Sequence, residues 1–405
     1  DIRNLNGSTV KGPVWSFRLS VASTTPLSVS AASLRGSTSV VSSSLTINTA
    51  RSDTAWALTE NTPWLSLSTA SGVGPSTTTL NFNPTGLAAG VHAAQISLTS
   101  GADTVSIPVT FQLLGALNII KMEADPSLPR IYALHADLSN PSEAWLLWID
   151  PVTARIDQFL QVGLDATDFA VHTADDRLYV LTQNGSSLVS VQLQQTPRIT
   201  NSLTLATPAV AVHNGPVGRV VTRSAANTLQ MLHSVTGGAV GSSVNLAHGI
   251  TRSSSSGNLL FAAVQQSTSS TGIERYTLSS SGISYSSASY WNGMLGGQFV
   301  VSGNGERAFY NQAVYSLNGN IALSANLPAA IVASSWNGLM AFSTTKSYST
   351  SAQWEALRNL PMTTTLMAVT ADQSRLVQFS PTTRVFTSID PGAMALAPSN
   401  RSEER

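Results

Sequence analysis

The sequence contains no cysteine, and only 10% of its 405 residues are charged. Without thiols, the chain has neither a disulfide framework nor a thiolate metal site. Ordinary globular domains carry about 25% charged residues, whereas here Ser and Thr take many surface positions, which favours a secreted or surface-displayed β protein. The 21 basic residues balance the 21 acidic ones, so no net field would attract nucleic acid or anionic lipid.

Long apolar runs are missing as well. No stretch of eighteen apolar residues exists, so we expect no membrane span. Residues 1–6 do not resemble a signal peptide, and we interpret them as a mature or truncated start. A chain of this size without cysteine is common among exported bacterial proteins. The motifs of zinc proteases, EF-hands and serine hydrolases are absent, so we predict no catalytic residue, metal or cofactor.

A hairpin of two short apolar runs around a polar turn recurs along the chain. In its clearest copy, residues 168–172 form the first run, 173–176 the turn and 177–182 the second run. Seven second runs begin at Arg130, Arg177, Arg219, Asn258, Arg307, Gly338 and Arg375. Their average spacing of about 41 residues is typical of four-stranded propeller blades.

These patterns predict an all-β protein with two domains. Residues 27–114 alternate apolar and polar side chains between turns rich in Gly, Pro and Asn, which predicts a sandwich. Residues 115–395 carry the repeats and predict a seven-bladed β-propeller, whose last blade lacks an evident outer strand. Residues 396–405 form a polar tail.

Four segments of the first domain match a known pattern: Pro-Trp-Leu-Ser-Leu at 63–67, Ser-Gly-Val-Gly at 71–74, Asn-Pro-Thr-Gly-Leu at 83–87 and Ile-Pro-Val at 107–109. They resemble a BACON-type immunoglobulin-like domain. The resemblance covers about a fifth of the chain and implies an extracellular bacterial module, often found beside glycan-acting or adhesive domains. Trp64 is a sugar-stacking platform or a packing residue, and we expect packing.

The propeller repeats contain Asp-Asp-Arg-Leu-Tyr at 175–179 and Asn-Gly-Glu-Arg at 304–307. These segments resemble seven-bladed propellers of the YVTN or lactonase-like type. The resemblance implies a fold and leaves the activity open.

Residues 1–26 contain an apolar strand at 13–19, with Val14, Trp15, Phe17 and Leu19. Two interpretations remain open. The strand is the end of a preceding, similar domain, or it pairs with a sheet edge in its own or a neighbouring chain and supports self-association.

Candidate binding residues cluster on the face that carries the connections between blades. Residues that open inner strands line the central channel there, next to the aromatic pair of the loop before the fifth blade. The set suits a polar ligand or a sugar and comprises Asp165, Asp168, His248, Gln298, Tyr290 and Trp291.

Catalysis and metal binding have weaker support. Asp165 and Asp168 are only three residues apart, so we do not expect them to face each other across a glycosidic bond. His172 and His213 occupy equivalent blade positions without a carboxylate in register, which reflects the repeat rather than a metal site.

The leading hypothesis is an extracellular bacterial binding or adhesion protein, whose propeller recognises a glycan or a surface protein. One alternative is a structural subunit of a surface assembly or filament built by strand addition. The other is a propeller enzyme of the lactonase or polysaccharide-degrading type.

Overall fold

The computed structural model describes residues 2–3, 9–10, 27–31, 34–37, 41–87, 90–136, 143–193, 197–293, 296–350 and 353–391. The chain divides into two compact units, Asp1–Leu113 and Leu114–Arg405. Their regular elements are almost all strands, so the protein is all-β. Among the residues described, no helix has the length and apolar character needed to cross a membrane.

The first unit contains two larger sheets and one small pair of strands. The small pair is β1 (Ile2–Arg3) and β2 (Thr9–Val10). In sheet order, one larger sheet is β3 (Ser28–Val29), β5 (Ser42–Asn48), β9 (Ser76–Phe82) and β7 (Leu65–Leu67). The other is β4 (Leu34–Ser37), β11 (Asp103–Leu113), β10 (Gly90–Ser100), β6 (Ala55–Thr59) and β8 (Ser71–Val73), with β4 parallel to β11.

Both larger sheets contribute alternate side chains to one core, as strands with one buried face do. Ile47 and Leu80 from one sheet pack with Ile107 from the other, and all three are fully buried. Trp64 is 6% exposed, and its ring centroid lies 5.6 Å from that of Phe111. Trp64 is therefore a packing residue, as expected from the sequence.

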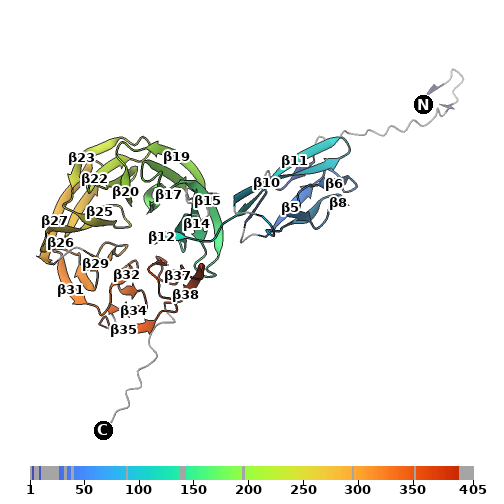
Figure 1. Cartoon of the computed structure of the whole chain (residues 1–405). Helices are drawn as coiled ribbons and strands as arrows, with labels where there is room; N and C mark the ends of the chain where they lie inside the picture. The colour runs from blue at the N-terminus through green and yellow to red at the C-terminus, as the bar shows by residue number, and fades with distance from the viewer. Residues whose placement is uncertain are drawn as a thin grey trace, which may run out of the picture. The chain divides into compact units, whose positions relative to one another are not determined.

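The second unit consists, in its described part, of seven antiparallel sheets, each built from one continuous segment (Figure 1). The first three are β12 (Ile119–Ala124), β13 (Ile131–Ala136), β14 (Glu143–Ile149), β15 (Ile156–Leu164); β16 (Asp168–His172), β17 (Arg177–Thr182), β18 (Ser187–Gln192), β19 (Arg198–Thr204); and β20 (Ala209–Asn214), β21 (Arg219–Ser224), β22 (Thr228–His233), β23 (Ala239–Asn245). A short 3₁₀ turn, η1 (Thr173–Asp175), links β16 to β17.

The remaining sheets follow the same order. They are β24 (Gly249–Ser253), β25 (Leu259–Ser267), β26 (Ser270–Ser279), β27 (Gly282–Asn292); β28 (Phe299–Val301), β29 (Arg307–Tyr310), β30 (Ala313–Ser316), β31 (Ala322–Asn326); β32 (Ile331–Ser334), β33 (Met340–Ser343), β34 (Lys346–Ser349), β35 (Ala356–Asn359); and β36 (Met367–Val369), β37 (Leu376–Ser380), β38 (Val385–Ile389). The last sheet has three strands within the described chain.

The seven sheets form a closed ring. Each first strand contacts the first strand of the next sheet, and β36 returns to contact β12. Figure 1 shows the last blade beside the first. Across this junction Leu147 packs with Val377 and Phe379, and the Ser388 hydroxyl donates to the carbonyl of Pro151. Within the described residues the ring closes by packing between the first and last blades, since no strand is exchanged between them.

The second strands are buried on both faces, which explains their continuous apolar runs. In β17, Leu178 and Val180 pack toward the first blade, while Tyr179 and Leu181 pack toward the third. Each second strand begins at, or one to two residues after, a predicted repeat position. The seven-fold repeat of the sequence is therefore confirmed. Residues 13–19 and 396–405 lie outside the described residues.

Candidate functional site

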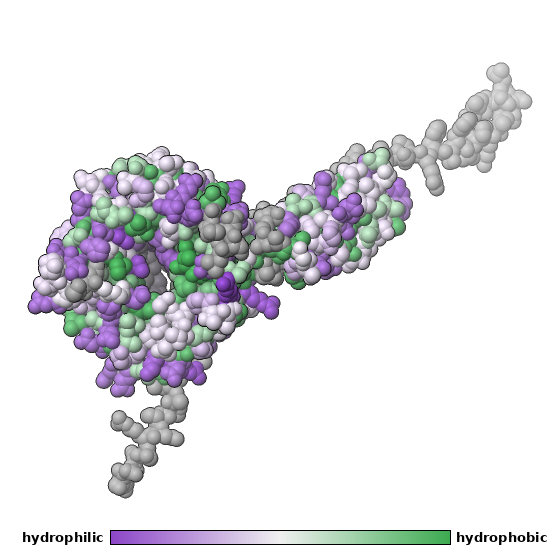
Figure 2. All heavy atoms as spheres, in the orientation of Figure 1, coloured by the Kyte–Doolittle hydropathy of each residue, from purple (hydrophilic) through white to green (hydrophobic). Residues whose placement is uncertain are grey.

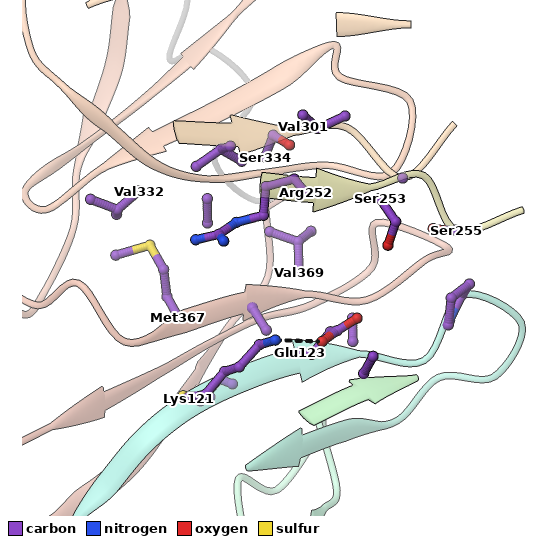
Figure 3. Close-up of a pocket in the computed structure, with 18 of the residues that line it drawn as sticks. Lys121, Glu123, Arg252, Ser253, Ser255, Val301, Val332, Ser334, Met367 and Val369 are labelled. Atoms are coloured by element: carbon purple, nitrogen blue, oxygen red, sulfur yellow. Dashed lines mark ion pairs between the residues drawn. The ribbon is translucent and has the colours of Figure 1, made fainter. Parts of the chain in front are cut away.

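One cavity of about 490 Å³ lies at the axis of the ring, where first strands of all seven blades contribute to its lining. In Figure 2, hydrophobic side chains gather around the hollow at the centre of the propeller, and hydrophilic ones occupy its outer rim. Figure 3 shows the apolar part of the wall, with Val301, Val332, Met367 and Val369. The charged side chains of the lining come from the first, second and fourth blades.

A lysine between two carboxylates forms one side of this channel, and Figure 3 shows its ion pair with one of them, Glu123. Lys121 Nζ lies 2.7 Å from Asp168 Oδ1 and 3.4 Å from Glu123 Oε2. It also donates to the carbonyl of Phe169 and lies 5.1 Å from the centre of that ring. The second Asp168 oxygen accepts the Val212 N–H at 2.9 Å. Both oxygens of Asp168 are therefore engaged within the protein.

The pKa values of Lys121 and Glu123 are raised, whereas that of Asp168 is lowered. For Asp168, burial raises the pKa, but the Lys121 charge and the hydrogen bonds outweigh burial and hold it below its usual value. Burial raises the pKa of Glu123, and Lys121 compensates only in part. For Lys121, burial lowers the pKa, but the two carboxylates outweigh burial and raise it. Asp168 is thus a firmly ionised partner of Lys121, and Glu123 is the more easily protonated carboxylate.

The third and fourth blades place two guanidinium groups near this cluster. Arg252 extends into the cavity from β24 (Figure 3), and its charge, after burial, helps to lower the pKa of Arg223. Among the described residues, Arg252 forms no ion pair, and its guanidinium donates one hydrogen bond, to the carbonyl of Thr251 at 2.9 Å. Burial lowers the pKa of His213 to about 3, so this neighbouring imidazole is neutral at physiological pH.

At the end of the channel where the first strands terminate, Trp336 forms part of the rim. It follows β32 and is 41% exposed. Hydrogen bonds between backbone groups connect the rim loops, because Asn304 N donates to Trp336 O at 2.9 Å and Ser255 N donates to Gly303 O at 2.7 Å. The indole lies so close to Gly303 that a Cβ there would be 2.3 Å from Trp336 Cδ1.

The structure places the residues predicted for the site in different regions. Asp168 and Gln298 line the channel, whereas Asp165 and His248 do not contribute to its lining. Asp165 has a left-handed backbone (φ 48°) in the turn before β16. His248 is exposed between β23 and β24, where its Nδ1 lies 3.3 Å from the Asn227 amide nitrogen.

The placement of Tyr290 and Trp291 in a loop is wrong. Both lie in β27, the outer strand of the fourth blade, which pairs with β26 over its whole length. Its serine-rich sequence looked like a loop, but hydrogen bonds to β26 hold it extended. Trp291 stacks on Tyr315 of the next blade at 4.9 Å, and the Tyr290 hydroxyl donates to Glu274 at 2.6 Å. Neither residue lines the channel.

Sequence reasoning missed Lys121, Glu123, Arg252 and Trp336. A usable signal existed for the first three, because charged residues are rare in this chain and these lie inside first strands. His172 and His213 do not share a metal site: His172 Nε2 lies 3.0 Å from Arg219 O, and His213 Nε2 lies 2.7 Å from Thr251 Oγ1. Within the described residues, no group of three metal-binding side chains occurs.

No protein-family model matches the sequence, and no curated protein matches it. Solved structures do resemble it. The chain is similar to Kuenenia stuttgartiensis hydrazine synthase with a TM-score of 0.53 and 10% identity, over 67% of this chain and 95% of the other. It is also similar to the Cps50 (Swd1) β-propeller domain of Myceliophteria thermophila, with a TM-score of 0.52 and 9% identity, over 68% and 98%. The fold is a β-propeller. At such low identity the likeness shows the fold alone.

Proposed function

We propose that this protein is an extracellular bacterial binding or adhesion protein that recognises a glycan or a surface protein through the propeller channel. One observation carries the proposal: the channel holds a pre-formed polar cluster in which the acidic groups are already partnered. A cavity of about 490 Å³ with a few converging polar groups in an apolar wall has the size and character of a binding site.

The bonding of the carboxylates favours binding over catalysis. Asp168 accepts hydrogen bonds on both oxygens. Asp125, at the end of β12, accepts from Ser127, Leu128 and Tyr132. A nucleophile or general base needs an oxygen that can reach the substrate, and neither aspartate offers one.

We further propose that the first unit is an immunoglobulin-like module of the BACON type and that the propeller is of the YVTN or lactonase-like type. The two-sheet core around Trp64 and the match of all seven repeat positions to second strands support these assignments. An extracellular location follows from the same resemblances and from the low content of charged residues.

A plugged channel tests the binding proposal. In the Val332→Trp variant of the full chain, the added indole projects into the channel and obstructs part of it, whereas Val385→Trp adds the same group to an exposed position on strand β38. We expect a glycan array to identify ligands for the unmodified protein, and calorimetry to show at least tenfold weaker binding by Val332→Trp with no change for Val385→Trp. Binding retained by the plugged variant would refute the channel as the site.

A second candidate function, hydrolysis of a lactone or a polysaccharide, rests on Glu123. Its raised pKa beside an ionised Asp168 resembles the division between acid and base in glycosidases. Turnover of lactones or polysaccharides by the unmodified protein, abolished in Glu123→Gln without loss of stability, would establish an enzyme. Absence of turnover on both substrate classes would remove this candidate.

A further inference from the structure

We propose that the channel ligand is an acidic sugar, whose ring stacks on Trp336 and whose carboxylate is bound by Arg252. This inference rests on the proposed binding function and names the chemical class of its ligand. It brings together two groups that the fold leaves available: a fixed, exposed indole at the rim and a guanidinium with unused donors inside the channel.

Trp336 has the properties of a stacking platform. A tryptophan that is 41% exposed leaves much of its apolar surface in water, and the flat face of a sugar ring covers such a surface well. The glycine at position 303 permits the close approach of the indole, and the backbone bond from Asn304 to Trp336 O fixes the loop. An indole held in place loses little conformational entropy on binding.

Arg252 supplies the anion-binding group. A guanidinium has five N–H donors in a planar fork that matches a carboxylate. Only one hydrogen bond of this group occurs in the described part of the chain, so most of its donors are available. Arg223 does not line the cavity, but its charge interacts with those of Arg252 and Asp168, so it adds to the positive potential behind this wall.

The remaining lining charges do not neutralise Arg252. The channel wall also carries Lys121, Glu123, Asp125 and Asp168, but these groups satisfy one another or are held by neighbouring donors. Glu123 keeps acceptor capacity beside Lys121, which suits a sugar hydroxyl. Ser253 and Ser255, which closely follow Arg252 in the chain, also line the cavity (Figure 3) and offer further hydroxyl partners. A ring face, several hydroxyls and one carboxylate are what an acidic sugar presents.

The test compares matched acidic and neutral sugars by titration calorimetry on the full chain. The probes are oligomers of glucuronic and galacturonic acid against glucose and galactose oligomers of equal length. We expect at least tenfold tighter binding of an acidic probe, and weaker binding as the salt concentration rises, because a charge pair contributes. Arg252→Gln and Trp336→Ala should each weaken binding at least tenfold, with Arg252→Lys intermediate.

Two control variants lie elsewhere on the propeller. Arg198→Gln removes an exposed arginine from β19, and Tyr285→Ala removes an aromatic residue that is 59% exposed on β27. Both should bind as the unmodified protein does. Thermal unfolding of every variant checks that a loss of affinity is not a loss of folding.

The outcomes separate this inference from the proposed function. If neutral sugars bind as tightly as acidic ones, or Arg252→Gln has no effect while Val332→Trp abolishes binding, the channel is a binding site and the acidic-sugar inference is wrong. If no acidic probe binds at millimolar concentration, the inference is also wrong. If Val332→Trp leaves every ligand found on the array bound, both proposals fail.

Discussion

The Lys121–Asp168 pair gives the sharpest prediction, because it lines the channel and also links the first blade to the second. Asp168 is 14% exposed and Lys121 31% exposed at the side chain, so the pair is largely but not fully buried. Loss of a charge-assisted hydrogen bond costs about 1.5–3 kcal/mol, and breaking a buried pair costs about 3–5 kcal/mol. For this partly exposed pair we expect Lys121→Met to lower the free energy of unfolding by about 2–4 kcal/mol.

Asp168→Asn should cost less than Lys121→Met. The asparagine oxygen still accepts the Val212 N–H, and Lys121 keeps Glu123 as its partner. Lys121→Met, by contrast, leaves two carboxylates facing each other without a cation. Adding Asp168→Asn to Lys121→Met should therefore restore stability, with a coupling free energy of about 1–3 kcal/mol.

The measurement is guanidinium unfolding of the full chain and the three variants, followed by tryptophan fluorescence and fitted for both units. If the double variant loses as much free energy of unfolding as the two single variants lose together, the pairing is refuted. An unchanged stability in Lys121→Met would show that the ion pair contributes nothing in solution.

The pH dependence of the same variants has a defined sign. Asp168 has a lowered pKa, so its stabilisation is present above its unfolded value of about 4 and is lost as the pH falls through the lower folded value. Lys121 has a raised pKa, so its contribution is present below about 10.4 and is lost as the pH rises through the higher folded value. The stability difference between the unmodified protein and Lys121→Met should shrink in acid, where Glu123 and then Asp168 become protonated, and again in alkali as the pH rises through the raised pKa of Lys121.

Further predictions concern other parts of the chain. Phe111→Ala should destabilise the first unit by about 3–5 kcal/mol, because this side chain is fully buried in the aromatic core; calorimetry should show an unchanged propeller transition. Gly185→Ala should cost at least about 2 kcal/mol, since φ is +81° and the new Cβ would meet Ala209 O at 1.8 Å; an unchanged midpoint would contradict this contact between blades. Glu274→Ala should lower the free energy of unfolding by about 3 kcal/mol, because Gln266, Tyr276 and Tyr290 all donate to this carboxylate. Tyr290→Phe removes only one of these bonds, so equal stability of the two variants would contradict the prediction. Deleting residues 1–24 should dissociate any polymer built through the strand predicted at 13–19, and an intact chain that light scattering shows to be monomeric would exclude such assembly.

Local patterns predicted the blades because each blade is made from one continuous segment. The runs at 168–172 and 177–182 pair within one hairpin, so apolar content and turn residues were enough to locate them. Local reasoning failed at Tyr290, where a serine-rich segment is a strand only because β26 supplies partners for its backbone.

The candidate site could be predicted only in part. Asp168 opens a first strand, and its position at the channel follows from the repeat. Its partner Lys121 lies in another blade, 47 residues away, and no local pattern indicates which charges meet. The sequence also gives no indication that Trp336 is exposed at the rim, because that depends on the neighbouring blade and on the glycine at 303.

By itself, the sequence determined the all-β class, the number of blades and the position of each second strand, because these depend on hydrogen bonds and apolar contacts between residues close in the chain. Only the tertiary structure decided which charges share the channel and which are left unpaired. Closing the ring brings Lys121 of the first blade to Asp168 of the second, while Arg252 of the fourth blade extends into the same cavity without a carboxylate partner among the described residues. Such pairings are set by the curvature of the ring, which no segment of the chain contains alone.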